Sequence, residues 1–376
     1  MTSFYRLFAA SLSHIILASL LCAGARADGL FTREGPTRNL DKQLGVVSEE
    51  KIRINADYFG NRVSYRSLGV DGTITLNLFA DGSLPMVLKA DPSAATGTTR
   101  ALSGVVDGSS ASSAGLAVRN GTISGAVVHE GKVFRITPGK DGSHIIQELD
   151  PSRFPEGDDH VPPPSVYEPP EENLSRATKA QSVDLLMLFE KNLAGELDIE
   201  QEAAAYMAMT NQIYGRVGRT EAERRVPFFR LVGVKAVDYV QGEDLHEDIN
   251  RLDGKNDGYM DDIHDLRDKL GADLVTLIVP RPARNVCGVG NLGPQTAGAR
   301  AYANSGFSVT AYVCRNGLTF PHELGHNLGA LHDRAVSSSN IKRFNFGIVN
   351  LEDNWRTVMA YQRSCREAER RCPRIP

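Results

Sequence analysis

The chain has 376 residues, of which 41% are apolar and 23% are charged, with 35 glycines and 18 prolines. This composition is typical of a globular protein and excludes a fibrous or largely disordered chain. The formal net charge of −4 provides no excess of basic residues, so we expect no nucleic-acid binding and no stable association with a membrane.

Residues 1–27 have the features of a secretory signal peptide. Arg6 gives a positive start, an apolar run from Leu12 to Leu21 follows, and Ala25-Arg26-Ala27 is a small-x-small cleavage site. Cys22 raises the alternative of a lipoprotein, although the residue before a lipidated cysteine is normally small and Leu21 is not. We therefore expect a secreted protein, extracellular or in transit through the periplasm.

Residues 28–150 are predicted to form a β-rich domain. Short alternating runs, such as 73–78 and 132–136, are separated by Asp-Gly turns at 71–72, 81–82, 107–108 and 141–142. Residues 151–180 are predicted to be a linker. Seven prolines between Pro151 and Pro170 favour an extended, solvated chain there.

The remaining residues, 181–376, alternate between strand and helix patterns. Strands are predicted at 183–189, 226–234 and 272–279, and helices at 199–217 and 261–270. Residues 307–313 alternate more strongly and are predicted to be an edge strand. This order favours an α/β fold with a largely parallel sheet.

Gly288 to Gly293 matches the glycine pattern of dinucleotide-binding sites. Such a site requires the glycines to leave a strand tightly and to open a helix. Eight residues separate this run from the preceding predicted strand, and Pro294 follows it. We therefore expect no nucleotide at this position.

The stretch 322–333 has the spacing of a metal site. His322 and His326 are four residues apart and so lie on one face of a helix, where both imidazoles reach a single cation. Gly329 permits a left-handed conformation that ends the helix, and the chain can then bring back His332 as third ligand. Three neutral imidazoles leave zinc with one open position, which indicates catalysis rather than a structural role.

The pattern H-E-x-x-H-x-x-G-x-x-H at 322–332 resembles the zinc motif of the metzincin endopeptidases. Met359, within Thr357-Val358-Met359-Ala360-Tyr361, resembles the methionine turn that lies beneath the zinc in that clan. Asp333, directly after the third histidine, is similar to the residue typical of the reprolysin, or adamalysin-like, branch. The closest resemblance is to secreted bacterial reprolysin-like proteases, and it runs from about residue 183 to 361.

The resemblance implies a metzincin catalytic domain of the α/β class, with a mixed five-stranded sheet, a zinc helix and a methionine turn. It implies that the edge strand of the sheet holds an extended substrate by β-augmentation. Residues 28–150 would then be a β-rich propeptide domain. We expect a monomer that acts on protein or peptide substrates.

The implied activity is zinc-dependent hydrolysis of peptide bonds. Zinc polarises the scissile carbonyl and lowers the pKa of its bound water towards about 7. Glu323 is the expected general base, which passes its proton to the leaving amine. Tyr361 is placed like a tyrosine that reaches the zinc or the oxyanion in astacin-like and serralysin-like enzymes, although a packing role is the alternative. The alternative function is a catalytically silent binding or effector protein, against which the presence of Glu323 argues.

The C-terminal end departs from the family pattern. Only 17 residues follow Met359, so we expect the usual C-terminal helix to be shortened or missing, and no further Cys-rich module is present. Cys287 with Cys314 and Cys365 with Cys372 are the local disulfide candidates, although four cysteines allow three connectivities. The arginines between 363 and 374 are interpreted as a solvated tail.

If the protease is made as an inactive precursor, a group other than a cysteine must block the zinc, because no cysteine lies between the signal peptide and Cys287. The linker contains the cluster Asp158-Asp159-His160, and a carboxylate or imidazole from it could ligate zinc. Astacin-like zymogens use an aspartate in this way. The alternative is that the cluster is solvated and that the linker blocks the cleft sterically.

Overall fold

The structure is a computed structural model of the whole chain, and it describes residues 29–37, 44–55, 73–77, 83–157, 159–161, 182–215, 228–293, 306–337 and 345–375. The predicted signal peptide, with Cys22, lies outside these residues, as do Asp158 and the Asp-Gly turns at 71–72 and 81–82. Within the described residues, no helix combines the length and the apolar character needed to span a bilayer.

The N-terminal half of the described chain forms one antiparallel sheet. Its strands are β1 (Phe31–Pro36), β2 (Val46–Ile54), β3 (Thr73–Asn77), β4 (Ser83–Ala90), β5 (Arg100–Val106), β6 (Ser113–Arg119), β7 (Thr122–His129), β8 (Lys132–Pro138) and β9 (His144–Leu149). From the described residues, the order is β1-β2-β9-β8-β7-β6-β5-β4-β3, so each strand from β3 to β9 pairs with its neighbour in sequence. The predicted β-rich character of residues 28–150 agrees with this sheet.

The second sheet is mixed. It contains β10 (His160–Val161), β11 (Val183–Glu190), β12 (Phe229–Val237), β13 (Leu274–Val279), β14 (Gly288–Asn291) and β15 (Phe307–Ala311). Among the described residues its order is β10-β14-β15-β13-β11-β12, and only the β14–β15 pair is antiparallel. Five of these strands come from residues 183–311, and β10 comes from the predicted linker.

One strand prediction differs from the structure, and one strand was not predicted. The predicted edge strand at 307–313 is β15, which lies inside the sheet between β13 and β14. Its alternation misleads because Ser308 and Thr310, which suggest a solvent-facing side, are both fully buried. Among the strands of residues 183–311, the edge position belongs to β14, which the glycine-rich run at 288–293 forms and which no hydrophobic pattern signals; β10 of the predicted linker pairs with its outer side.

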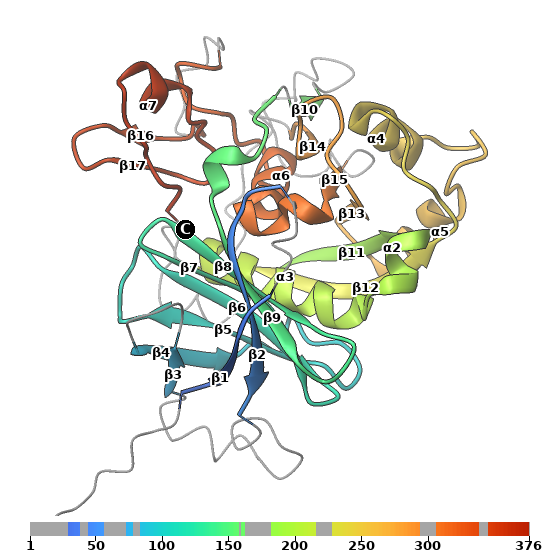
Figure 1. Cartoon of the computed structure of the whole chain (residues 1–376). Coiled ribbons are helices and arrows are strands. Elements are labelled where there is room, and N and C mark those ends of the chain that lie inside the picture. Colours follow the sequence, from blue (N-terminus) through green and yellow to red (C-terminus); the bar gives the residue numbers. More distant parts are fainter. Residues whose placement is uncertain are drawn as a thin grey trace, which may run out of the picture.

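Helices cover both faces of the mixed sheet (Figure 1). They are α2 (Lys191–Glu196), α3 (Ile199–Tyr214), α4 (Leu245–Asp253), α5 (Asp262–Leu270) and α6 (Thr319–Asn327). A short helix, α7 (Arg363–Glu367), lies in the C-terminal segment, and 3-10 turns lie at Pro151–Arg153 and Tyr312–Gly317. Leu185, Met187 and Phe189 of β11 pack towards α3 and α6. Leu186 and Leu188, on the opposite face, pack with α4 and α5. Burial on both faces explains the continuous apolar run at 183–189.

Helix α3 lies between the two sheets (Figure 1). A helix that is buried all round needs apolar residues on every side, and α3 supplies a run of small and apolar residues from Ala203 to Ala208. Polar contacts also cross the boundary: Ser124 of β7 donates to Glu202, and the Gln201 side chain donates to the carbonyl oxygen of Ala117 at 3.1 Å. The N-terminal sheet is therefore packed against the back of the α/β unit.

Part of the predicted solvated linker is instead packed. Residues 151–157 and 159–161 form a 3-10 turn, a short extended segment and strand β10. Phe154 is 7% exposed and Asp159 is 7% exposed, so the prediction of a solvated chain is wrong for these residues. Pro151 begins the 3-10 turn, a position where its fixed φ and missing N–H are tolerated.

Candidate metal centre

Helix α6 carries the first two histidines of the predicted metal site. All nine of its residues are buried, because α6 packs against β14, β15 and α3. His322 and His326 are one helical turn apart, so both imidazoles leave the helix on the same side. This placement agrees with the spacing predicted from the sequence.

The chain turns sharply after α6. Gly329 has a φ of +86°, a left-handed backbone conformation that a glycine adopts without steric cost. The N–H groups of Gly329 and Ala330 donate to the carbonyl oxygens of His326 and Gly325 at 2.8 and 2.9 Å, which closes the helix end. The turn brings His332 back towards the two helical histidines.

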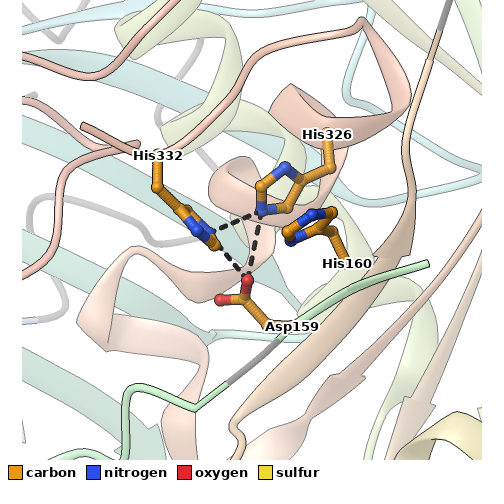
Figure 2. Close-up of side chains that lie close together, drawn as sticks. All are labelled: Asp159, His160, His326 and His332. Carbon is orange, nitrogen blue, oxygen red and sulfur yellow. Dashed lines mark hydrogen bonds and ion pairs between the residues drawn. The ribbon is translucent and has the colours of Figure 1, made fainter. Parts of the chain in front are cut away.

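The three imidazoles converge on one point. The Nε2 atom of His326 lies 3.0 Å from Nε2 of His322 and 3.1 Å from Nε2 of His332, and the His322–His332 separation is 3.3 Å. Figure 2 shows His326 and His332 directed at each other and at Asp159. All three histidines are 3% exposed or less.

Backbone carbonyl groups fix the orientation of two of these rings. The Nδ1 atom of His322 lies 2.8 Å from the carbonyl oxygen of Val358, and Nδ1 of His326 lies 2.9 Å from that of Ala330. A carbonyl oxygen only accepts, so we assign the proton of each ring to Nδ1. The lone pair of each Nε2 then faces the point of convergence, as in a metal ligand.

Asp159 completes the group from the opposite side. Its Oδ1 lies 2.7 Å from Nε2 of His332 and 3.3 Å from Nε2 of His326, and its Oδ2 lies 3.2 Å from Nε2 of His322. Burial alone raises the pKa of Asp159, but the three imidazoles outweigh it and hold that pKa well below its usual value. The sequence cluster at 158–160 thus includes a carboxylate that lies directly at the histidines.

The backbone of the same segment occupies the edge of the mixed sheet. Strand β10 pairs with β14 in parallel, and the N–H groups of Gly290 and Leu292 donate to the carbonyl oxygens of Asp159 and Val161 at 2.9 and 2.8 Å. This edge is the one at which an extended peptide could add as a further strand. Residues 159–161 therefore take that place in the described chain.

The donor set fits a zinc ion. Four nitrogen and oxygen acceptors face one buried point, and within the described residues Asp159 Oδ1 has no hydrogen-bond donor. Such a group of acceptors repels itself unless a cation lies between its members. Tetrahedral zinc with Zn–N bonds of about 2.0–2.1 Å separates its nitrogens by about 3.3–3.4 Å, close to the separations observed here. Burial also lowers the pKa of His322 to about 3, which keeps its ring neutral, as ligation requires.

Glu323 lies beside the histidines without being part of the three-imidazole group. It is fully buried, and neither of its carboxylate oxygens has a hydrogen-bond donor among the described residues. Burial, and then the neighbouring charge of Asp159, raise the pKa of Glu323 well above its usual value. Glu323 and His322 line a small cavity together with Gly288 of the edge strand.

Tyr361 packs on the third histidine. Its ring centroid lies 4.0 Å from that of His332, and its hydroxyl donates to the carbonyl oxygen of Gly157 in the linker. Burial, and then the charge of Asp159, raise the pKa of Tyr361, so the phenol remains a hydrogen-bond donor. Both readings of this tyrosine, as oxyanion donor and as packed residue, remain compatible with its position at the site.

Asp333 and Met359 connect the histidine site to the chain that follows it. The Asp333 carboxylate accepts from the N–H groups of Tyr361 at 3.0 Å and Ala335 at 3.1 Å, so it ties the third-histidine turn to the chain after Met359. The Met359 sulfur packs against Gly325 of α6 so closely that a β-carbon at that position would lie 2.4 Å from it. The segment that contains Met359 therefore packs against the helix that carries His322 and His326.

His160, the remaining described member of the predicted latch cluster, stacks on a histidine of the site. Its ring centroid lies 5.3 Å from that of His326, with 29° between the ring planes (Figure 2). Its ligand atoms lie within 4.8 Å of those of Asp159, His326 and His332. Asp158 lies outside the described residues.

The structure contains two disulfides, and it contradicts one interpretation of the C-terminal segment. Cys287 is bonded to Cys314, and Cys365 to Cys372, which are the two local pairs considered from the sequence. The interpretation of residues 363–374 as a solvated tail is wrong for Arg374, whose side chain is 10% exposed and lies 3.6 Å from Glu156 of the linker. Sequence reasoning missed this contact, because an arginine-rich end has no periodicity that distinguishes a buried guanidinium from a solvated one.

Comparison with known proteins identifies one family. The family described as Metallo-peptidase family M12 matches residues 179–370, which include the whole histidine site. The N-terminal sheet lies outside this match.

Curated relatives extend the similarity further along the chain. The Peptidyl-Asp metalloendopeptidase of Stenotrophomonas maltophilia (strain K279a) is 27% identical over 277 residues, covering 69% of this chain and 60% of the relative. The protein of the same name from Xanthomonas campestris pv. campestris is 27% identical over 291 residues, covering 73% and 63%. The chain therefore spans less than two thirds of the length of these relatives.

Among solved structures, a chain titled "Structure of a chaperone-substrate complex" aligns over 62% of this chain and 31% of its own, with 15% identity and a TM-score of 0.35.

The turn at Gly329 generates a first prediction. A residue with a β-carbon resists the left-handed conformation by about 1–2 kcal/mol, so Gly329→Val should displace His332 and reduce retained zinc after dialysis about tenfold. Gly258 has a nearly identical φ of +87° in an exposed turn, and nothing lies within 4 Å of a β-carbon added there. Gly258→Val is therefore a matched control that should keep its zinc. Elemental analysis measures both, and normal zinc in Gly329→Val would contradict the role of this turn.

Proposed function

This chain belongs to metallo-peptidase family M12, and on that premise we propose that it is the latent precursor of a secreted zinc-dependent endopeptidase. The observation that carries the proposal is the convergence of three imidazole nitrogens and the Asp159 carboxylate on one buried point. In this proposal residues 1–27 are the signal peptide, 28–150 the propeptide domain, 151–180 the linker and 181–376 the protease domain.

His322, His326 and His332 would hold the zinc. When bound, zinc supplies a Lewis acid that lowers the pKa of water and polarises a carbonyl group. The carbonyl groups of Val358 and Ala330 keep two of the three rings in the tautomer that this role needs. Side chains of the protein itself transfer the proton and donate to the oxyanion.

Glu323 is the proposed general base. It lies next to the histidines in a buried cavity that the edge strand β14 also lines, so a peptide on that strand places its scissile bond within reach of the carboxylate. Glu323 takes the proton of the attacking water and returns it to the leaving amine. Tyr361, with its phenol protonated, is the proposed donor to the developing oxyanion, once the linker no longer accepts its hydrogen bond.

Asp159 is the proposed latch of the precursor. Its carboxylate takes the position that water and substrate need at the three histidines, and the backbone of residues 159–161 takes the strand position on β14. Cutting or withdrawing the linker opens both positions, whereas removal of the carboxylate alone opens the position at the histidines. Enzymes of this family hydrolyse peptide bonds. The printed name of the relatives, Peptidyl-Asp metalloendopeptidase, supports peptide bonds at aspartate as those that this chain cleaves.

The second prediction tests the general base. General acid–base catalysis contributes about 10²–10⁴-fold to rate, so Glu323→Ala should lower turnover of a peptide substrate by that factor while zinc content stays unchanged. Glu196→Ala, on the exposed surface of α2, is the control and should keep wild-type turnover. Chelation should abolish cleavage by the wild-type and control proteins alike. The comparison uses processed protein, from which the linker has been removed. Glu323→Ala with more than a few per cent of the turnover of processed wild type would contradict this assignment, and inactive processed wild-type protein would favour a silent binding protein.

The third prediction tests the latch. Asp159→Ala removes the carboxylate from the histidines, so the unprocessed precursor should cleave a short peptide at least about tenfold faster than the wild-type precursor. Initial rates are measured while intact mass shows the chain to be uncut. Asp141→Ala, which removes an exposed carboxylate from the N-terminal sheet, should stay latent. If Asp159→Ala is as inactive as wild type, the strand pairing of residues 159–161 alone accounts for latency.

A further inference from the structure

Glu156, three residues before Asp159, is held by arginines from the C-terminal end of the chain. Its Oε1 lies 3.0 Å from Nη2 of Arg356 and 3.6 Å from Nη2 of Arg374, and its Oε2 accepts from the Gln362 N–H at 2.8 Å. The side chains of Glu156 and Arg374 are each 10% exposed, and that of Arg356 is 3% exposed. The linker thus inserts a carboxylate into a buried basic pocket.

The pocket is built by the chain on both sides of α7. Arg356 belongs to β17 (Trp355–Arg356), and its N–H donates to the carbonyl oxygen of Pro373 at 3.0 Å, which places Arg374 beside it. The Arg356 Nε also donates to the side-chain oxygen of Gln362 at 2.9 Å. The disulfide between Cys365 and Cys372 closes the loop that carries Arg374 back to this position. The Arg356 guanidinium is therefore held by contacts other than Glu156, and the backbone places Arg374 beside it.

Two buried guanidinium groups side by side need an anion. Burial, and then the charge of Arg374, lower the pKa of Arg356 to about 9, and the charge of Glu156 acts in the opposite direction. A buried charge left without its partner is strongly unfavourable. The pocket is thus complementary to a carboxylate rather than to a neutral side chain.

The pocket is continuous with the metal centre. One small cavity is lined by Glu156, Arg374 and Tyr361 together with Gly288, His322 and Glu323. A peptide that replaces the linker along this cavity places a side chain at the arginines while its backbone lies at Glu323. The arginines are therefore positioned to contact a residue close to the bond that is cut.

We propose that Arg356 and Arg374 form a subsite for an acidic side chain of the substrate, and that Glu156 fills this subsite in the precursor. The proposal rests on the proposed function and assigns its specificity to residues: the two guanidinium groups bind an aspartate or glutamate within a few residues of the cleaved bond. Guanidinium groups recognise carboxylates through charge-assisted hydrogen bonds, which an amide of the same shape cannot replace. Glu156 and Asp159 then occupy two different parts of one substrate site.

A binding experiment on the full chain tests the subsite without any catalysis. Glu156→Ala removes the carboxymethyl group that lies at the arginines, so its melting temperature should fall by several degrees, and millimolar propionate, a small soluble carboxylate, should restore at least half of the loss. Propionamide, which has the same shape without the charge, should restore nothing. Glu130→Ala, at an exposed turn of the N-terminal sheet, should show no propionate effect. Equal effects of propionate and propionamide on Glu156→Ala would overturn the proposal.

A cleavage experiment tests the substrate class directly. The processed wild-type protein is incubated with a mixed peptide library, and the new termini are sequenced; we expect acidic residues to be enriched next to the cut. Arg374→Gln should lower kcat/KM at least about tenfold for an acidic peptide and leave the matching amide peptide unchanged. Arg363→Gln, which removes an exposed guanidinium from α7, should change neither.

The two experiments separate the possible failures. Cleavage by wild type without acidic enrichment overturns the subsite and leaves the proposed function standing. If wild type cleaves no peptide with zinc present, the proposed function fails, and the propionate result still decides whether the arginines bind a carboxylate. Unfolding of Glu156→Ala leaves the cleavage pattern of the wild-type protein as the deciding result.

Discussion

The site depends on one electrostatic constraint: three imidazole lone pairs and a carboxylate meet at a buried point, and only a cation makes that arrangement favourable. The surrounding fold serves this convergence. Helix α6 sets the spacing of two histidines, the left-handed Gly329 returns the third, and the Val358 carbonyl, next to Met359, orients the first ring. The Asp333 carboxylate then joins the turn after α6 to the methionine turn.

The linker occupies the positions that a bound substrate would occupy. Its backbone pairs with the edge strand β14, Asp159 lies at the histidines and Glu156 lies between two arginines. These three contacts come from six consecutive residues, 156–161, so latency and recognition share one surface. The parts of the chain that the linker contacts come from 288–292, 322–332 and 356–374, which explains why its packing has no local sequence signature.

The sequence predicted the local features of the site and missed those that depend on distant partners. The histidine spacing, the turn at Gly329 and the family resemblance, which the M12 match confirms, follow from short-range pattern. Strand β14 was missed because Gly288 and Gly290 carry no hydrophobic signal, and β15 was misplaced because Ser308 and Thr310 are buried hydroxyl groups. The burial of Asp159 and Arg374 could not be predicted, since each depends on residues far away in the chain.

The coordination of the metal in the unprocessed precursor tests the central claim most directly. Purified precursor is loaded with zinc, and a crystal structure with anomalous scattering at the zinc edge identifies the metal and its ligands. The account predicts zinc bound by Nε2 of His322, His326 and His332, with a carboxylate oxygen of Asp159 as the remaining protein ligand. A precursor in which water takes that position and Asp159 faces away, or in which the histidines hold no zinc, would contradict the account.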